Sequence, residues 1–325
     1  MAKTGDYGIK YIENDDSVDI VTDMNGNFMA VSEELSNLSD EIGDCASVQH
    51  SHNLNSSSIT GVLPVNKGGT GANNLKQAKK NLGIQKHCYI VAAGNSDSNL
   101  KDYADFIIEG EKDFQNVIDS APSGSVIKFL SGNYYLYSSS LKIDKQLIFE
   151  GSGHQTVIYA NGLNNQPVFK LGTDDVEKPT SNITIKDIYI SNRDTGYDSA
   201  RNLIEAGNIN GLYIYRVGFN FNITNKVMSG SSILKGSGYM RNVHIHDCVI
   251  NSNIPDNSKE RYCFNFKGID ASKKAEFCAY ISNTSYLNNT EFSVNLLDAD
   301  MKNKIALTGI LGGYKLYVNK QEVAQ

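Results

Sequence analysis

The spacing of apolar residues predicts a helix near the N-terminus. Five apolar residues recur at intervals of 3, 4, 3 and 4, namely Phe28, Val31, Leu35, Leu38 and Ile42. This is the heptad spacing of a coiled coil. Two heptads are too few for an isolated coiled coil, and the same spacing also fits an amphipathic helix that packs on its own domain. We therefore expect a helix over residues 25–45, with both kinds of packing open.

Four later segments share one pattern of apolar and polar positions. They are residues 183–190, 212–219, 243–250 and 279–286, offset by 29, 31 and 36 residues. Each has two alternating apolar residues, a polar corner and two more inward positions. The four inward columns are Ile183, Leu212, Val243 and Ala279; Ile185, Ile214, Ile245 and Ile281; Ile188, Val217, Cys248 and Thr284; and Ile190, Phe219, Ile250 and Tyr286. Such a pattern predicts stacked coils of a solenoid, with strands about 4.8 Å apart.

The polar positions of the repeat make a second set of predictions. Asp187, Arg216 and Asp247 occupy the same corner in successive segments, so opposite charges are expected to pair there at the surface. The alternation also turns His244 and His246 outward, beside Tyr213 and Tyr215 of the preceding segment. We expect these rings to stack rather than to bind a metal ion.

Two further elements flank the repeat. A short helix is predicted where Asp113 serves as a cap and Phe114, Val117, Ile118 and Ala121 share one face. Near the end of the chain, a β-hairpin is predicted to turn at Gly312 and Gly313 and to cover the open edge of the last coil.

Composition and charge argue against nucleic acid and membranes as partners. The net charge of −6 gives no reason to expect nucleic acid, and the apolar runs are too short for membrane insertion. The N-terminus lacks the apolar segment of a signal peptide. The five cysteines form no Cys-x-x-Cys pair and are odd in number, which favours free thiols in a protein made in a cytoplasm.

Residues 59–72 read Ile-Thr-Gly-Val-Leu-Pro-Val-Asn-Lys-Gly-Gly-Thr-Gly-Ala, and a short helical pattern ending in Asn-Leu-Gly follows. A phosphate-binding loop is disfavoured because Ala-Asn, not Lys-Ser/Thr, follows Gly71. Over residues 49–85 the chain resembles the linker module of bacteriophage tail fibres. The resemblance implies a homotrimeric appendage of a phage tail or a related contractile particle. It also implies that residues 1–24 attach to a baseplate or tail protein.

A histidine pair, His50 and His52, lies just before this module. In an extended backbone both side chains point to one side. In a parallel trimer, six imidazoles would then surround one axis and suit a transition-metal ion, as the resemblance to trimeric phage fibres implies. A solvated pair in a loop is the alternative.

The strand-rich region from residue 87 resembles the opening of pectin-lyase-like domains. The resemblance rests on Ala104-Asp105 before the short helix, Gly132-x-Tyr134, and Leu147-x-x-Glu-Gly-x-Gly153. It implies a right-handed parallel β-helix. The expected chain is mainly β, with an attachment segment (1–24), a coiled-coil helix (25–45), a linker module (46–86), the β-helix (87–289) and a C-terminal cap or tip (290–325).

Two functions remain open on this scaffold. The first is a tail-fibre or receptor-binding protein of the virion that attaches the particle to a bacterial surface polysaccharide or another receptor. The second is a tailspike that cleaves the polysaccharide, which needs paired carboxylates, or a base and a cation. No catalytic residue stands out among the candidates Asp174, Asp175, Glu177, Asp187, Glu205 and Asp247, or the cations Arg193, Arg201, Arg216 and Arg241. A free secreted lyase leaves residues 1–86 unexplained.

Overall fold

The computed structural model divides into two compact units, Met1–Ile84 and Gln85–Gln325, which are described separately. It describes residues 20–44, 71–72, 78, 81–82, 87–192, 201–221, 230–252, 261–287, 292–311, 313–318 and 321–323. The predicted attachment segment up to residue 19, Cys45, the pair His50 and His52, Arg193 and most of the linker module lie outside these residues.

The first unit contains α1 (Ile20–Asp44), a helix of 25 residues that begins five residues before the predicted start. Its side chains are described from residue 24 to residue 39. The predicted apolar seam lies at the surface of the chain: Phe28 is 67% exposed and Leu35 61%, and Val31 and Leu38 are exposed as well. The helix of the prediction is therefore present, and in the single chain its apolar seam is uncovered.

Only a few residues of the glycine-rich module are described. Ala78 and Asn81 are helical, and the Leu82 amide donates to the Ala78 carbonyl over 3.0 Å. The Asn81 side-chain amide donates to the Gly71 carbonyl over 2.9 Å. These bonds agree with the short helix predicted after the glycines, and they tie its end back to the glycine-rich loop.

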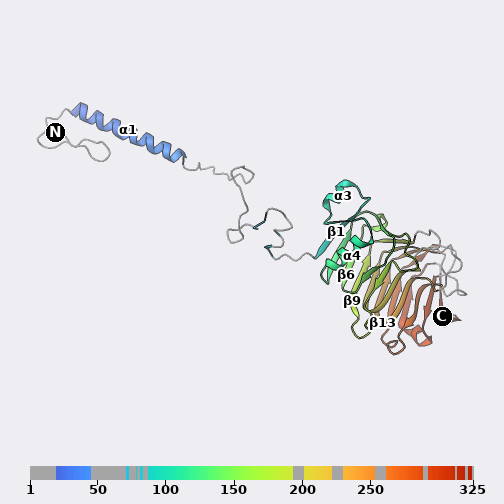
Figure 1. The fold of residues 1–325 in the computed structure, drawn as a ribbon. Coiled ribbons are helices and arrows are strands. Elements are labelled where there is room, and N and C mark those ends of the chain that lie inside the picture. The colour runs from blue at the N-terminus through green and yellow to red at the C-terminus, as the bar shows by residue number, and fades with distance from the viewer. Residues whose placement is uncertain are drawn as a thin grey trace. The chain divides into compact units, whose positions relative to one another are not determined.

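The second unit is mainly β and contains two sheets (Figure 1). The larger sheet has β1 (Cys88–Ala93), β2 (Phe106–Ile108), β3 (Ser125–Phe129), β5 (Leu141–Ile143), β6 (Leu147–Glu150), β8 (Phe169–Leu171), β9 (Thr180–Lys186), β11 (Asn202–Tyr215), β13 (Ser232–His246), β15 (Tyr262–Ile269), β16 (Ala279–Ser282), β18 (Phe292–Leu296), β19 (Ile305–Thr308), β20 (Tyr314–Val318) and β21 (Gln321–Val323). The smaller sheet has β4 (Gly132–Leu136), β7 (Thr156–Ala160), β10 (Tyr189–Asn192), β12 (Gly218–Phe221), β14 (Val249–Ser252) and β17 (Ser285–Tyr286).

The chain returns repeatedly from one sheet to the other, and each return adds a parallel strand beside the previous one. The long strands β11 and β13 join two parts of the larger sheet, because the first half of β11 pairs with β8 and its second half with β9. These strands bend where the backbone takes positive φ, at Asn208 and Gly211 in β11 and at Gly238 and Asn242 in β13.

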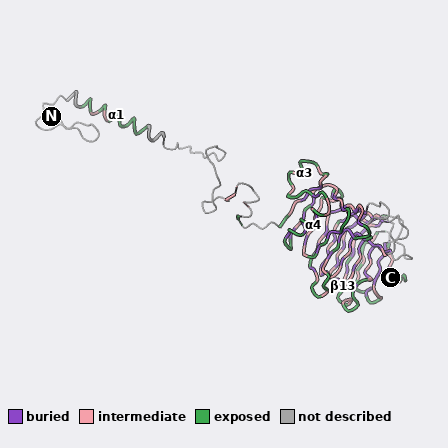
Figure 2. The backbone as a smooth tube through the Cα atoms, viewed as in Figure 1, coloured by how far each residue is buried: buried purple, intermediate pink, exposed green. Residues whose placement is uncertain are grey.

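The strand registers confirm the predicted alignment of the repeat. Ile214 of β11 is paired with Ile185 of β9 and Ile245 of β13, and Ile245 is paired with Ile281 of β16. In the smaller sheet, Phe219 is paired with Ile190 and Ile250, and Ile250 with Tyr286. All sixteen residues of the four predicted columns are buried, so the columns belong to the core. Figure 2 shows buried residues in purple along the strands of the second unit.

The predicted corner is a left-handed turn in each copy. Asp187, Arg216, Asp247 and Asn283 have φ of 55°, 51°, 56° and 48°. Asp and Asn accept this conformation more readily than most residues do. Arg216 forms two bonds with Asp187, with Nε to Oδ1 at 2.6 Å and Nη2 to Oδ2 at 2.7 Å. The predicted ion pair between neighbouring layers is confirmed for Asp187 and Arg216.

The helices of the second unit are short: α3 (Ser98–Tyr103), α4 (Glu111–Ser120), η2 (Gly153–Gln155) and η4 (Ala299–Lys304). Phe114, Val117 and Ile118 of α4 are buried, as predicted. The helix begins earlier than expected, with Gly110 at the N-cap. The Asp113 carboxylate instead accepts a bond from the Glu109 amide over 3.1 Å, so Asp113 secures the first turn from inside the helix.

The C-terminal region corrects the predicted hairpin. β19 is parallel to β16, and β20 is parallel to β18, so both strands extend the parallel layers beyond residue 289. The hairpin is formed by β20 and β21, which are antiparallel. The predicted turn at Gly312 and Gly313 lies between two strands that belong to different parallel pairs, and Gly312 itself lies outside the described residues. Sequence alone does not distinguish a connection between layers from a hairpin turn. The edge strand β21 has only three residues, a length that discourages further pairing.

Two sequence predictions concern thiols and membranes. Cys88, Cys248, Cys263 and Cys278 are free, and burial raises the pKa of Cys248 to about 12 and of Cys263 to about 11. These two thiols therefore stay protonated and pack as small apolar groups. In the described part of the chain, no helix has the length and apolar character needed to cross a membrane.

Candidate functional site

Outward-facing residues of five strands, β9, β11, β13, β16 and β19, form two columns on the larger sheet. The registers place one column at Thr184, Tyr213, His244, Tyr280 and Ala306, and the other at Lys186, Tyr215, His246, Ser282 and Thr308. The rings in these columns form what we call the aromatic stripe: Tyr213, Tyr215, His244, His246 and Tyr280.

The rings of the stripe stack across neighbouring strands. Tyr213 and His244 have centroids 5.2 Å apart and ring planes inclined by 19°, and His244 and Tyr280 are 4.9 Å apart at 22°. Tyr215 and His246 are 5.5 Å apart at 14°. These separations follow from the spacing of paired strands, about 4.8 Å. The predicted stacking of His244 and His246 on tyrosines is confirmed.

The pKa of His244 and the hydrogen bond of His246 are both compatible with rings that stack. Burial, and next the charge of His246, lower the pKa of His244, so the His244 ring is neutral at pH 7. The Nδ1 atom of His246 is hydrogen bonded to the Ser282 hydroxyl. Within the described residues, no group of three or more His, Cys, Asp or Glu side chains is placed to hold a metal ion.

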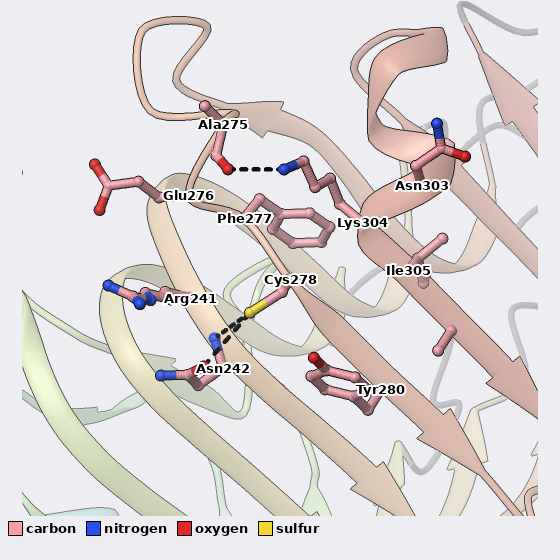
Figure 3. Close-up of a pocket in the computed structure, with 11 residues that line it drawn as sticks. Arg241, Asn242, Ala275, Glu276, Phe277, Cys278, Tyr280, Asn303, Lys304 and Ile305 are labelled. Carbon is pink, nitrogen blue, oxygen red and sulfur yellow. Dashed lines mark hydrogen bonds between the residues drawn. The ribbon is translucent and has the colours of Figure 1, made fainter.

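A pocket of about 580 Å³ opens at the end of the stripe that Tyr280 occupies (Figure 3). The neighbouring strands β13, β16 and β19 contribute Asn242, Tyr280 and Ala306 to its lining, and Cys278 lines it just before β16. Its walls come from the segment before β16 and from the end of η4, which contribute Glu276, Phe277, Asn303 and Lys304. The pocket and the stripe share Tyr280 and are therefore one continuous surface.

Ion pairs and hydrogen bonds hold the pocket walls. The Lys274 ammonium lies 2.6 Å from the Asp298 carboxylate and 2.9 Å from that of Asp300. The bond from Lys274 lowers the pKa of Asp298. The Lys304 ammonium donates to the Ala275 carbonyl over 3.1 Å. The segment before β16 is thus joined to the segment of η4 at two points.

Polar groups of the pocket are mostly arranged in pairs. The backbone N–H of Asn242 donates to the Cys278 sulfur over 3.3 Å, and the Cys278 thiol donates to Asn242 Oδ1 over 3.4 Å. Burial raises the pKa of Tyr239, whose hydroxyl also bonds to Arg241 and Glu276. Arg241, one of the cations noted from the sequence, lines this pocket and is an exposed residue.

The structure brings two of the candidate carboxylates, Asp174 and Glu205, to one pocket of about 170 Å³, and five of the six candidates form ion pairs. Asp187 pairs with Arg216 at 2.6 Å, Glu205 with Lys235 at 3.3 Å, and Glu177 with Lys273 at 3.1 Å. Asp174 and Asp175 pair with nearby lysines on their own segment. Each of these five carboxylates therefore has a cationic side chain as its partner.

A second group of rings, on the smaller sheet, was missed by the sequence reasoning. Tyr135 stacks on Tyr159 with centroids 5.3 Å apart and planes inclined by 15°, and Tyr137 lies 6.1 Å from Tyr135. The sequence signal that could have found this group is the spacing of Tyr135 and Tyr137, which places both rings on one face of an extended segment. Their partner Tyr159 lies outside the four aligned segments, so its register was not fixed by the sequence.

Comparisons with models of known families, with curated proteins and with solved structures found no match for this chain.

Proposed function

We propose that this chain is a tail-fibre or receptor-binding protein that attaches a phage or phage-like particle to a glycan on the bacterial surface. The observation that carries the glycan-binding part is the aromatic stripe, where Tyr213, His244 and Tyr280 stack in register beside an open polar pocket. The assignment to a phage particle rests on the resemblance of residues 49–85 to the linker module of tail fibres.

The chemistry of the stripe suits a sugar chain. Tyrosine rings have a broad apolar face and a polar hydroxyl, so they can pack against the C–H face of a sugar and still bond to its hydroxyl groups. Amide and charged side chains at the pocket, such as Asn242 and Asn303, supply the few polar contacts that fix the orientation of a ligand.

The proposed scaffold is a right-handed parallel β-helix. Three features support it: the alternation of the chain between two sheets, the parallel register from layer to layer, and the core of aligned apolar columns. The right hand is expected because parallel crossover connections are almost always right-handed. A stack of this kind presents a long, rigid outer face, which is suitable for an extended polysaccharide.

The proposed particle-bound form is a homotrimer that joins a baseplate or tail protein through its N-terminal segment. The exposed seam of α1 supports assembly, because an apolar stripe at heptad spacing is stabilised when further helices cover it. His50 and His52 would then surround the trimer axis and bind a transition-metal ion. If they do, a chelator should weaken the trimer, and a His50→Ala, His52→Ala variant should no longer respond to the chelator.

Binding to purified bacterial surface polysaccharides, measured by biolayer interferometry on the full-length protein, tests the proposed function. We expect the wild type to bind one or more polysaccharides of the panel, and Tyr213→Ala or Tyr280→Ala to weaken that binding at least tenfold. Tyr103→Ala is the matched control, because Tyr103 is 77% exposed and lies on α3, away from the stripe.

Two results would count against this function. Equal binding by the wild type and both stripe variants would show that the stripe is not the binding site. Failure of the wild type to bind any polysaccharide would contradict a glycan receptor. Release of soluble saccharide from the bound polymer would instead support the alternative, a tailspike depolymerase.

A further inference from the structure

The stack of rings in the aromatic stripe ends at Tyr280 and leaves one ring face open. On one side, Tyr280 packs on His244, with centroids 4.9 Å apart. On the other side, the next residue in the column is Ala306 of β19, which has no ring to continue the stack. Tyr280 is 45% exposed. A position for one more ring is therefore open beside Tyr280 and above Ala306.

This position lies inside the pocket, whose lining contains more positive than negative side chains. Tyr280 and Ala306 both line it, together with the cations Arg241 and Lys304 and one carboxylate, that of Glu276. Figure 3 shows Lys304 above Ile305 on one side and Arg241 on the opposite side, with Cys278 and Tyr280 between them. An ammonium has three donors, and one of those of Lys304 is used by the Ala275 carbonyl.

We propose that the open position is a subsite for a single pyranose ring and that it selects a sugar carrying a carboxylate. The proposal rests on the proposed function and specifies its ligand. The sugar ring takes the place of the next ring in the stack, with its apolar face on Tyr280. Arg241 and Lys304 bind its carboxylate. The side-chain amides of Asn242 and Asn303, which line the same pocket, face its hydroxyl groups.

Because the chain has a net negative charge, an anionic ligand needs positive side chains at the point of contact. The net charge is −6, so the protein as a whole repels an anionic polymer. Arginine and lysine at the point of contact offset this repulsion by forming charge-assisted hydrogen bonds, which are stronger than neutral ones. The Glu276 carboxylate and Arg241 both interact with the Tyr239 hydroxyl, and the lining keeps two positive side chains against one negative one.

The first test fills the open position. Ala306→Tyr places a ring where the sugar ring would stack, and it should weaken binding of the best-bound polysaccharide of the panel at least tenfold. Thr308→Tyr is the matched control. It adds the same side chain to the same strand, two residues further on, where the neighbouring residue of the column is Ser282, which has no ring. Both residues are exposed, so unchanged thermal unfolding should confirm that both variants fold.

The second test addresses the carboxylate. The same polysaccharide is used in its native form and after its carboxyl groups have been reduced to alcohols. We expect reduction to weaken binding to the wild type about tenfold or more, and Arg241→Gln and Lys304→Gln to weaken binding of the native form to a similar extent. Lys178→Gln serves as the control, because Lys178 is exposed and lies outside the pocket. The two pocket variants should bind the reduced form as the wild type does.

The outcomes separate this subsite from the proposed function. If the wild type binds a polysaccharide and Ala306→Tyr binds it equally well, the subsite is wrong and the glycan receptor stands. If the best-bound polymer has no carboxylate, or if reduction has no effect, the selection for an acidic sugar is wrong. If the wild type binds no polymer of the panel, the proposed function fails, and the subsite fails with it.

Discussion

The two units place their apolar side chains in opposite ways. In α1, Phe28, Val31, Leu35 and Leu38 lie along one seam and are exposed. In the second unit, each apolar column is covered by the strands of the opposite sheet, and Ile185, Ile214, Ile245 and Ile281 are fully buried. The stacked strands thus bury their own apolar surface, whereas the helix exposes apolar surface that another chain can cover.

This difference follows from geometry. A layered sheet encloses its inward residues between its own parallel strands, so each added layer extends the core. A lone helix has one apolar stripe and no second surface within itself to cover that stripe. The second unit is therefore expected to be stable by itself, and the stability of α1 to depend on association.

The largest expected effect comes from the core of the second unit. Ile245→Ala removes a fully buried side chain and should lower the free energy of unfolding by about 2–5 kcal/mol, because it loses apolar contacts and leaves a cavity. Leu35→Ala, a matched truncation in α1, should leave the unfolding of the second unit unchanged. Thermal unfolding followed by circular dichroism measures both. Equal losses from the two substitutions would contradict the comparison.

The next effect concerns assembly. Leu35→Asp places a charge in the exposed seam and should lower the solution mass of the full-length protein to that of one chain, because a carboxylate would be buried between helices. Thermal unfolding of the second unit should not change. Glu34→Gln, at the neighbouring exposed position, is the control and should keep the wild-type mass. A Leu35→Asp variant with the wild-type mass would show that the seam does not carry the assembly.

A smaller effect is expected at low pH. The Glu150 carboxylate lies 2.7 Å from the Lys186 ammonium, and this bond lowers the pKa of Glu150. Because the folded pKa is lowered, the contribution to stability is present above the ordinary pKa of 4.5 and is lost as the pH falls through the folded value. Glu150→Gln should remove this part of the acid dependence, at a cost of about 0–1 kcal/mol at neutral pH for a pair at the surface.

The smallest effect is expected at the corner ion pair. Asp187→Asn removes the charge that Arg216 faces but keeps a side chain that tolerates positive φ. The loss of stability should be about 0–1 kcal/mol, because the pair is at the surface, and it should decrease at high salt. Urea unfolding at low and high salt would measure it. A loss of several kcal/mol would mean that the corner, and not the buried columns, dominates the stability of the layers.

The repeat was predictable from the sequence because a buried column demands apolar residues at fixed positions. Once Ile185, Ile214, Ile245 and Ile281 were aligned, the register placed His244 beside Tyr213 without further information. The pocket was not predictable, because Glu276 and Lys304 lie on connections whose lengths differ between layers. The hairpin at the end was misplaced because glycines allow both a tight turn and a connection between layers.

The solution mass of the full-length wild-type protein, measured by light scattering, tests the central comparison most directly. We expect the mass of three chains, because the same seam of other copies would cover the exposed seam of α1. The mass of a single chain at micromolar concentration, with the helix formed and the seam still exposed, would contradict it.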